Sequence, residues 1–182
     1  GTSLTTDEAP DPRFGMLAPM TTRTETTPGG LERVTITSRD VTLVEPDDIL
    51  SVATLTESTD VNGRTATRAF DASTRVWTMT SPEGRVRTQK LDALGRTIEQ
   101  AFASFEPVTM SYDTDGRLVQ TAQGDRIATQ SYHATDGWLT SVTDALSQTT
   151  SFTHDGHGRV LTTTRPDGKV IGQSYDLNGN LA

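Results

Sequence analysis

Tyr112-Asp113-Thr114-Asp115-Gly116-Arg117 is the clearest copy of a short pattern that recurs along this 182-residue chain. The pattern starts with an aromatic or aliphatic residue, continues with aspartate, and closes with Gly-Arg. Imperfect copies start at Phe70, Leu91, Tyr132, His154 and Tyr175, so that successive starts are 20 to 22 residues apart. Such a regular period predicts a repeat architecture, in which one small unit is stacked many times and no unit buries a core alone.

The Asp-x-x-Gly piece of each copy predicts the tip of a β-hairpin. The carboxylate of Asp113 can accept hydrogen bonds from backbone groups two or three residues later, and Gly116 can adopt a positive φ without steric cost. The same residue types recur at the same offsets as Asp92, Gly95 and Arg96; as Asp155, Gly158 and Arg159; and, after Tyr175, as Asp176 and Gly179. These positions and Tyr112, Asp113, Gly116 and Arg117 are the candidate turn and packing residues of the repeat.

A second turn signal lies half a period away from each tip. Ser81-Pro82-Glu83-Gly84 and Arg165-Pro166-Asp167-Gly168 both place proline second and glycine fourth, as hairpin turns often do. Two turns per period predict two strands per repeat and a continuous antiparallel meander. Its expected glycine tips are Gly63, Gly84, Gly95, Gly116, Gly137, Gly158, Gly168 and Gly179, and its expected strands include 117–121, 126–132, 148–153, 160–164 and 169–175.

The predicted strands are polar on both faces. Leu161-Thr162-Thr163-Thr164 and Ala128-Thr129-Gln130-Ser131 have no clean apolar side, which a sandwich or a filled barrel would require. Hydrophobic residues make up only 32% of the chain, whereas residues that favour strands are common. We therefore expect an all-β fold, in which repeated antiparallel hairpins form a curved single-layer sheet with solvent on both sides.

The domain organisation predicted from these patterns has three parts. Residues 1–23 are expected to form a flexible lead, residues 24–61 an irregular β segment, and residues 62–182 the regular repeat array. Only Asn180-Leu181-Ala182 follow the last tip, so the array is expected to be truncated at its C-terminus. An unpaired sheet edge there would recruit flanking repeats or allow self-association.

Composition excludes several classes of function. The net charge of -8 argues against nucleic-acid binding, which needs clustered lysine and arginine. No apolar run approaches the roughly 20 residues that span a bilayer, so no membrane span is expected. The first residues show no basic and apolar signal-peptide pattern, and the absence of cysteine excludes disulfides and thiolate chemistry.

The Tyr-Asp pattern with Gly-Arg, at a period of about 21 residues, resembles the YD-repeat or Rhs-repeat family. The best matching pieces are 112–118, 82–86 and 166–170, and the resemblance covers residues 62–182. Several copies depart from the pattern: Leu91 and His154 replace the aromatic residue, His133 replaces aspartate, and Asn180 replaces arginine. Thr74 replaces the turn glycine of the first copy, which predicts a differently shaped tip there.

The resemblance implies a structural role. Rhs proteins and Tc toxin components wind such repeats into a hollow shell around a C-terminal toxin domain, and teneurins use similar shells at cell contacts. By this resemblance the chain is a wall segment of a shell that encapsulates a toxin or effector, located at a bacterial cell surface or secreted. Its partners would be flanking repeats and a C-terminal toxin domain, and no cofactor or enzymatic activity is implied.

Candidate metal and catalytic residues have simpler interpretations within the repeat. His154-Asp155-Gly156-His157 brings histidine and carboxylate close in sequence, but each residue already fills a turn or packing position. Asp113-x-Asp115 and Asp176-x-Asn178 resemble fragments of calcium loops without the glutamate that would complete them. No nucleophile motif is present. We therefore expect neither an enzyme nor a metal site.

The alternative hypothesis is an extracellular module that binds carbohydrate or protein. Trp77, Trp138 and Tyr132 are the aromatic residues that could stack on sugar rings. Packing across neighbouring strands is the commoner use of such residues in a sheet.

Overall fold

The structure, a computed structural model, describes residues 1–182 and consists of 15 β-strands joined by turns. It contains no helix long and apolar enough to cross a membrane. The strands are β1 (Ser3–Asp11), β2 (Gly15–Thr26), β3 (Glu32–Leu43), β4 (Val52–Val61), β5 (Arg64–Asp71), β6 (Val76–Thr80), β7 (Val86–Leu91), β8 (Thr97–Phe102), β9 (Val108–Tyr112), β10 (Leu118–Gln123), β11 (Arg126–Tyr132), β12 (Leu139–Thr143), β13 (Thr149–His154), β14 (Val160–Thr164) and β15 (Val170–Gly172).

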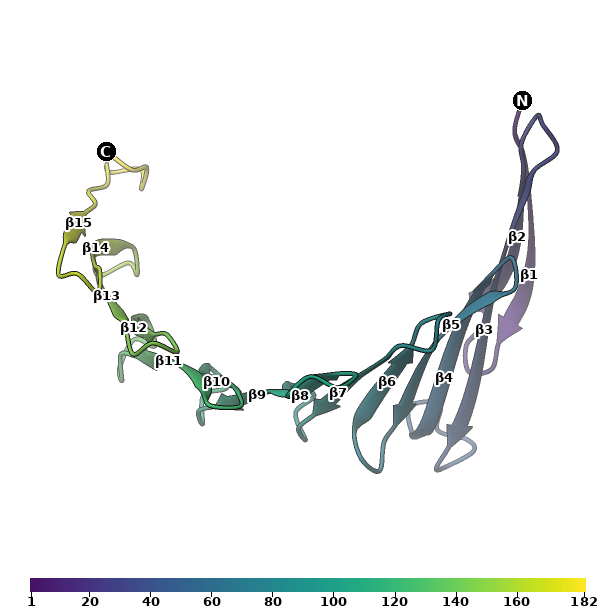
Figure 1. The fold of residues 1–182 in the computed structure, drawn as a ribbon, viewed down its shortest axis with the longest axis horizontal. Helices are drawn as coiled ribbons and strands as arrows, with labels where there is room; N and C mark the ends of the chain where they lie inside the picture. The colour runs from purple at the N-terminus through teal and green to yellow at the C-terminus, as the bar shows by residue number, and fades with distance from the viewer. The chain divides into compact units, whose positions relative to one another are not determined.

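The first compact unit, Gly1–Phe105, holds β1 to β8. Each strand pairs antiparallel with the next strand in the sequence, and Figure 1 shows these strands side by side in one layer. The pairings are long: β3 and β4 stay in register from Thr35 opposite Val61 to Thr42 opposite Thr54. The unit is therefore a meander held together by its backbone ladder.

The second unit, Glu106–Ala182, repeats this plan with the shorter strands β9 to β15. In both units, the packing contacts between elements join strands that are consecutive in the sequence, so no strand packs over another. This arrangement confirms the predicted all-β, single-layer antiparallel meander.

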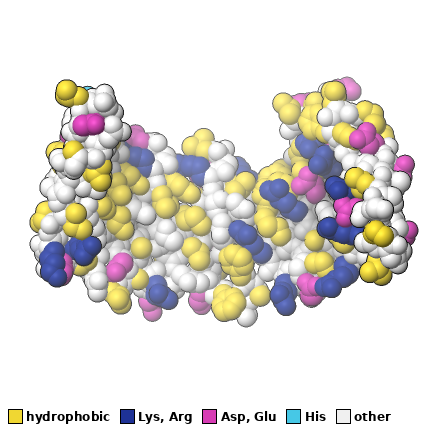
Figure 2. Space-filling view, turned by 90° about the horizontal axis from the view of Figure 1, so that it is seen from above, with side chains coloured by type: hydrophobic (Ala, Val, Ile, Leu, Met, Phe, Trp, Pro, Cys, Tyr) yellow, Lys and Arg dark blue, Asp and Glu magenta, His cyan; other side chains and the backbone are white.

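Neither unit has an apolar core of the usual kind. Leu55 is the one buried hydrophobic side chain, at 9% exposure, and Asp11 is the one buried charged residue, at 4%. In Figure 2, hydrophobic side chains lie interspersed with charged ones across the face in view, instead of being gathered in one place. Hydrophobic burial is therefore small, and the hydrogen-bonded ladders and turns carry a larger share of the stability than in a globular domain.

A β-bulge follows the tip in four of the repeats, those that start at Leu91, Tyr112, Tyr132 and His154. The pairing register shifts around Ile98, Val119, Thr140 and Leu161, each of which has no partner directly opposite on the preceding strand. These four residues are spaced 21 residues apart. Because a bulge bends its strand and increases the local twist, its regular recurrence accounts for the curvature expected of the sheet.

The turns match the prediction at all eight expected glycines. Gly63, Gly84, Gly95, Gly116, Gly137, Gly158, Gly168 and Gly179 lie outside the strands, with φ between 74° and 85°. The tip after Phe70 differs, as the replacement by Thr74 predicted: the left-handed residue there is Arg75, with φ of 55°.

The N-terminal residues differ from the expectation. Residues 3–11 and 15–26, which include most of the stretch expected as a flexible lead, form β1 and β2, with Ser3 opposite Thr26. The pairing of β1 with β2 orders them, and the buried Asp11 caps the turn between them by accepting hydrogen bonds from the backbone N–H groups of Arg13 and Phe14. Residues 32–43 and 52–61 form two long paired strands instead of irregular ones, and β15 is shorter than the predicted 169–175.

We expect Gly116→Val to lower the free energy of unfolding by about 1–2 kcal/mol, because a β-branched side chain is strained at a positive φ. Gly156→Val is the matched control, since Gly156 lies in an equivalent tip without a positive φ and with open space around its Cα. Urea denaturation measures both variants. Equal losses of stability in the two would contradict the assigned turn geometry.

Candidate functional site: a latch between successive repeats

Each tip is held by the carboxylate of its own aspartate. Oδ1 of Asp155 accepts hydrogen bonds from the backbone N–H groups of His157 at 2.9 Å and of Arg159 at 3.0 Å. Its Oδ2 accepts one from Nε of Arg159 at 2.7 Å. One side chain therefore satisfies two turn N–H groups and fixes the direction of the arginine that follows the glycine.

The same arrangement recurs in three other tips. Asp92 with Arg96 and Asp113 with Arg117 make the same three hydrogen bonds, each with an Nε–Oδ2 distance of 2.7 Å. At Asp176, the amide of Asn180 replaces the guanidinium and donates to Oδ2 at 3.0 Å. The clamp is thus a property of the repeat.

These hydrogen bonds lower the pKa of the tip carboxyls. At Asp155, desolvation is the largest single effect and raises the pKa, but the hydrogen bonds from Arg159 and from the backbone outweigh it and bring the pKa down from 3.8 to about 2. The pKa of Asp92 and Asp113 is lowered too, because desolvation is outweighed by hydrogen bonds from the backbone and from the arginine, and hydrogen bonds from Asn180 lower the pKa of Asp176. The carboxylates are therefore ionised at neutral pH.

The clamped arginine reaches forward to the next repeat. The guanidinium carbon of Arg117 lies 4.9 Å from the ring centroid of Tyr132, and that of Arg159 lies 4.7 Å from the ring centroid of Tyr175. Each tyrosine hydroxyl donates back to the carbonyl of the residue after that arginine, Leu118 or Val160, at 2.9 Å. We call this set, the Asp-Arg pair of one tip and the tyrosine of the next repeat, the repeat latch.

The tip glycine has a second role where the latch lies against it. A Cβ atom added to Gly137 would lie 2.9 Å from Nη1 of Arg117, and one added to Gly179 would lie 3.5 Å from Nη1 of Arg159. The arginine of one tip therefore packs on the glycine of the next, 20 residues later. Glycine is favoured there for its conformation and for its lack of a side chain.

Trp138 takes the arginine position in one repeat, which the sequence analysis did not recognise. Its ring centroid lies 5.6 Å from that of His154, the residue in the tyrosine position, and a Cβ on Gly158 would lie 2.9 Å from its Nε1. The signal was present in the sequence, since positions 96, 117, 138, 159 and 180 are spaced 21 residues apart. Two aromatic rings thus replace the cation–aromatic pair.

Gly95 and Tyr112, the remaining candidate residues, lie at the glycine and tyrosine positions of the repeat. Gly95 closes the tip between Asp92 and Arg96, with a hydrogen bond from its N–H to the carbonyl of Asp92 at 3.1 Å. Tyr112 ends β9, and it is half-buried. It follows Arg96 by 16 residues, the same separation as between Arg159 and Tyr175.

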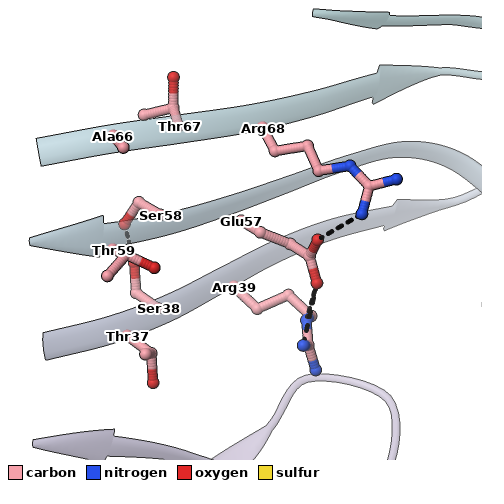
Figure 3. A pocket seen from close by; sticks show the side chains of 9 residues that line it. All are labelled: Thr37, Ser38, Arg39, Glu57, Ser58, Thr59, Ala66, Thr67 and Arg68. Atoms are coloured by element: carbon pink, nitrogen blue, oxygen red, sulfur yellow. Dashed lines mark hydrogen bonds and ion pairs between the residues drawn. The ribbon is translucent and has the colours of Figure 1, made fainter. Parts of the chain in front are cut away.

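The first unit carries a line of charges across its strands, which the sequence analysis also missed. Figure 3 shows Glu57 between Arg39 and Arg68, at 3.0 Å and 3.8 Å, beside a shallow cavity of about 340 Å³. Arg39 also contacts the buried carboxylate of Asp11. Burial raises the pKa of Asp11, but hydrogen bonds from the backbone N–H groups of Phe14 and Arg13 and from Arg39 lower it overall. The signal, opposite charges placed across strands, becomes visible only once the register is known.

The suspected metal ligands are engaged within their own tips. Asp155, Asp113 and Asp176 all accept hydrogen bonds from N–H groups, and Asp115 pairs with Arg117 at 2.8 Å. No group of three histidine, aspartate or glutamate side chains lies close enough together to hold a metal ion.

The suspected sugar-stacking residues pack on protein groups. The guanidinium carbon of Arg68 lies 3.8 Å from the ring centroid of Trp77, which also contacts Phe70 at 4.9 Å. Tyr132 lies under Arg117, and Trp138 lies between His154 and Gly158. All three aromatic residues therefore pack against side chains of neighbouring strands or tips.

Comparison with known proteins agrees with this geometry. The family model described as Teneurin YD-shell matches residues 3–182. The chain belongs to the teneurin YD-shell family. No curated protein sequence matches this YD-shell chain significantly.

Solved structures share the YD-shell fold. The crystal structures of TcdB2-TccC3-Cdc42 and of TcdB2-TccC3-TEV match it over its whole length, with TM-scores of 0.54 and 0.55 and 13% sequence identity in both. The YD-shell chain spans 12% of the length of each of these chains. Together, the family and the repeat latch indicate a structural role as part of a shell.

A double-mutant cycle tests the YD-shell latch. We expect Arg117→Gln and Tyr132→Leu to be coupled by about 0.5–1 kcal/mol in the free energy of unfolding, because each removes the same cation–aromatic contact. Arg126→Gln with Tyr132→Leu is the control pair, since Arg126 lies six residues away on the same strand and makes no contact with the ring. A coupling energy near zero for the first pair would contradict the latch.

The pH dependence of stability tests the clamp. The pKa of Asp155 in the folded state is about 2, below its usual 3.8. The ionised carboxyl therefore stabilises the fold fully above about pH 4, and this stabilisation is lost as the pH falls toward 2. We expect the melting temperature to fall over this interval, and the fall to be smaller in Asp155→Asn. Circular dichroism melts measure this, with Asp125→Asn as the control because Asp125 has no ion pair. Wild-type pH dependence in Asp155→Asn would contradict the assignment.

Proposed function

We propose that this chain is a wall segment of a YD-repeat shell that encloses a C-terminal toxin or effector for delivery. The observation that carries the proposal is the single-layer sheet without a core, in which Arg117 or Arg159 of one tip packs on the tyrosine of the next repeat. A sheet of this kind separates two aqueous spaces, which is what a container wall has to do. The likeness to the TcdB2-TccC3 structures supports the proposal through the shared fold.

The partners in this proposal are flanking repeats of a longer chain. The outer edges of β1 and β15 carry backbone groups that no strand of their own unit covers, and such edges recruit another strand. The 12% share of the matched chains agrees with a segment within a longer wall. We further propose that the protein is secreted or displayed at a cell surface, and that the repeats themselves catalyse no reaction.

The alternative hypothesis is an extracellular module that binds carbohydrate or protein, and carbohydrate binding has less support. It requires an open aromatic face, and Trp77, Trp138 and Tyr132 all pack on neighbouring side chains. A small aromatic cavity beside Trp138 includes His133 and Asp136, but these two residues pair with each other at 2.8 Å. The shell hypothesis accounts for these contacts, because in a shell wall the aromatic side chains pack between neighbouring strands.

Limited proteolysis of the full-length gene product tests the shell. We expect the region that follows the repeats to resist digestion in the wild type and to become accessible in Asp113→Ala/Asp155→Ala, because loss of two clamps loosens neighbouring repeats. Mass spectrometry of the fragments over time measures the protection. Asp125→Asn is the control, and it should leave the protection unchanged.

Two results would contradict the shell. One is digestion of the following region at the same fast rate in the wild type and the clamp variant. The other is a following region that resists proteases to the same extent after it has been separated from the repeats, since its protection would then be its own.

A further inference from the structure

One face of the first unit gathers its arginines. Side chains alternate between the two faces along a strand, and residues directly opposite each other share a face. The register therefore places Arg39, Glu57, Arg68, Met79, Arg87 and Phe102 in one row across β3 to β8. We call the side of the sheet that carries this row the arginine face. All six arginines of strands β1 to β8 lie on it, namely Arg23, Arg33, Arg39, Arg64, Arg68 and Arg87.

Arg87 differs from the other five arginines. Each of the others has a carboxylate within 4.0 Å, whereas Arg87 has no ion pair. Its guanidinium carbon lies 4.9 Å from the ring centroid of Phe102, and its Nε is buried without a hydrogen-bond partner. A half-buried cation that is fixed on an aromatic ring and has no carboxylate partner can receive an anion on its terminal amino groups.

Strands β6 to β8 place no acidic side chain beside Arg87 on the arginine face, and Glu83 in the turn between β6 and β7 pairs with Arg64. On the arginine face, strands β6 to β8 carry Trp77, Gln89 and Gln100 among their side chains, and Glu99 points to the opposite face. Arg68 stands two strands away in the same row. Its side chain is half exposed, and its 3.8 Å separation from Glu57 is too long for a strong pair.

We propose that this part of the arginine face binds an acidic peptide in an extended conformation, with one carboxylate on Arg87 and a second on Arg68. Two strand spacings put these arginines roughly 9.5 Å apart. In a polyproline II helix, residues i and i+3 lie on the same side, about 9.3 Å apart. A Glu-x-x-Glu segment in this conformation matches the two cations, and the Gln100 amide is placed to pair with its backbone.

A peptide fits this surface better than an acidic sugar does. Stacking on a sugar ring requires a free aromatic face, and Trp77 has Arg68 on its ring and Phe70 beside it. The amides and guanidinium groups that remain are donors, which suit carboxylates and peptide carbonyl groups.

The test is a titration of the full chain with the peptide Glu-Pro-Pro-Glu-Pro-Pro-Glu, followed by the NMR signal of the Arg87 Nε–H group. We expect this signal to shift, and the affinity to fall roughly five- to tenfold in Arg87→Gln. Arg87→Lys, which keeps the charge but loses the planar fork, should lose part of the affinity and provides a second variant if Arg87→Gln folds poorly. Binding should also weaken as salt is raised from about 20 mM to about 300 mM.

Three controls make the proposal falsifiable. Arg126→Gln removes an exposed arginine from the second unit and should leave the affinity unchanged. The peptide Pro-Pro-Glu-Glu-Glu-Pro-Pro has the same composition without the i, i+3 spacing and should bind more weakly, as should trigalacturonate. Equal loss in Arg126→Gln, no preference between the two peptides, tighter binding of trigalacturonate, or no shift of the Arg87 signal would each overturn the proposal.

Discussion

The aspartate that begins the clamped tips, at Asp92, Asp113 and Asp155, is the constraint on which the array depends. Its two carboxylate oxygens satisfy the turn and orient an arginine, which packs on the glycine and the aromatic ring of the following repeat. One side chain thus links local turn chemistry to the contact between repeats. Because these bonds are charge-assisted, they are stronger than the neutral hydrogen bonds of the ladder, and they recur where the sheet has little apolar area to bury.

Stability in such a molecule is distributed along the chain. Leu55 is the single buried hydrophobic residue, so no central core ties distant repeats together. Each repeat contacts its neighbours, and the free energy of folding is approximately a sum of repeat and interface contributions. The first unit supplements this scheme with long strands and with the charge pairs that connect Asp11, Arg39, Glu57 and Arg68.

Much of this could be predicted from the sequence, because turn chemistry is local. Asp113 and Gly116 specify a tip by themselves, and the polar faces of segments such as 161–164 indicate a single layer. The features that could not be predicted depend on residues far apart in the sequence. Residues 3–26 lack the repeat pattern, and only the pairing of β1 with β2 orders them. The row through Arg87 depends on the register of six strands, and Trp138 was hidden because a change of residue type concealed a conserved position in the repeat.

The bulges at Ile98, Val119, Thr140 and Leu161 have a consequence for how such walls change in length. Each bulge lies at a fixed distance after its tip, so a unit of about 21 residues contains one tip and one bulge. It also contributes residues to the contact with the repeat before it and to the contact with the repeat after it. Duplication or loss of a whole unit leaves every remaining junction intact. Insertion of a single residue within a strand would instead turn the side chains beyond it to the opposite face. Whole repeats can therefore be added or removed without disturbing the strands, whereas single residues are accommodated in the tips, as the extra residue between Tyr132 and Leu139 shows.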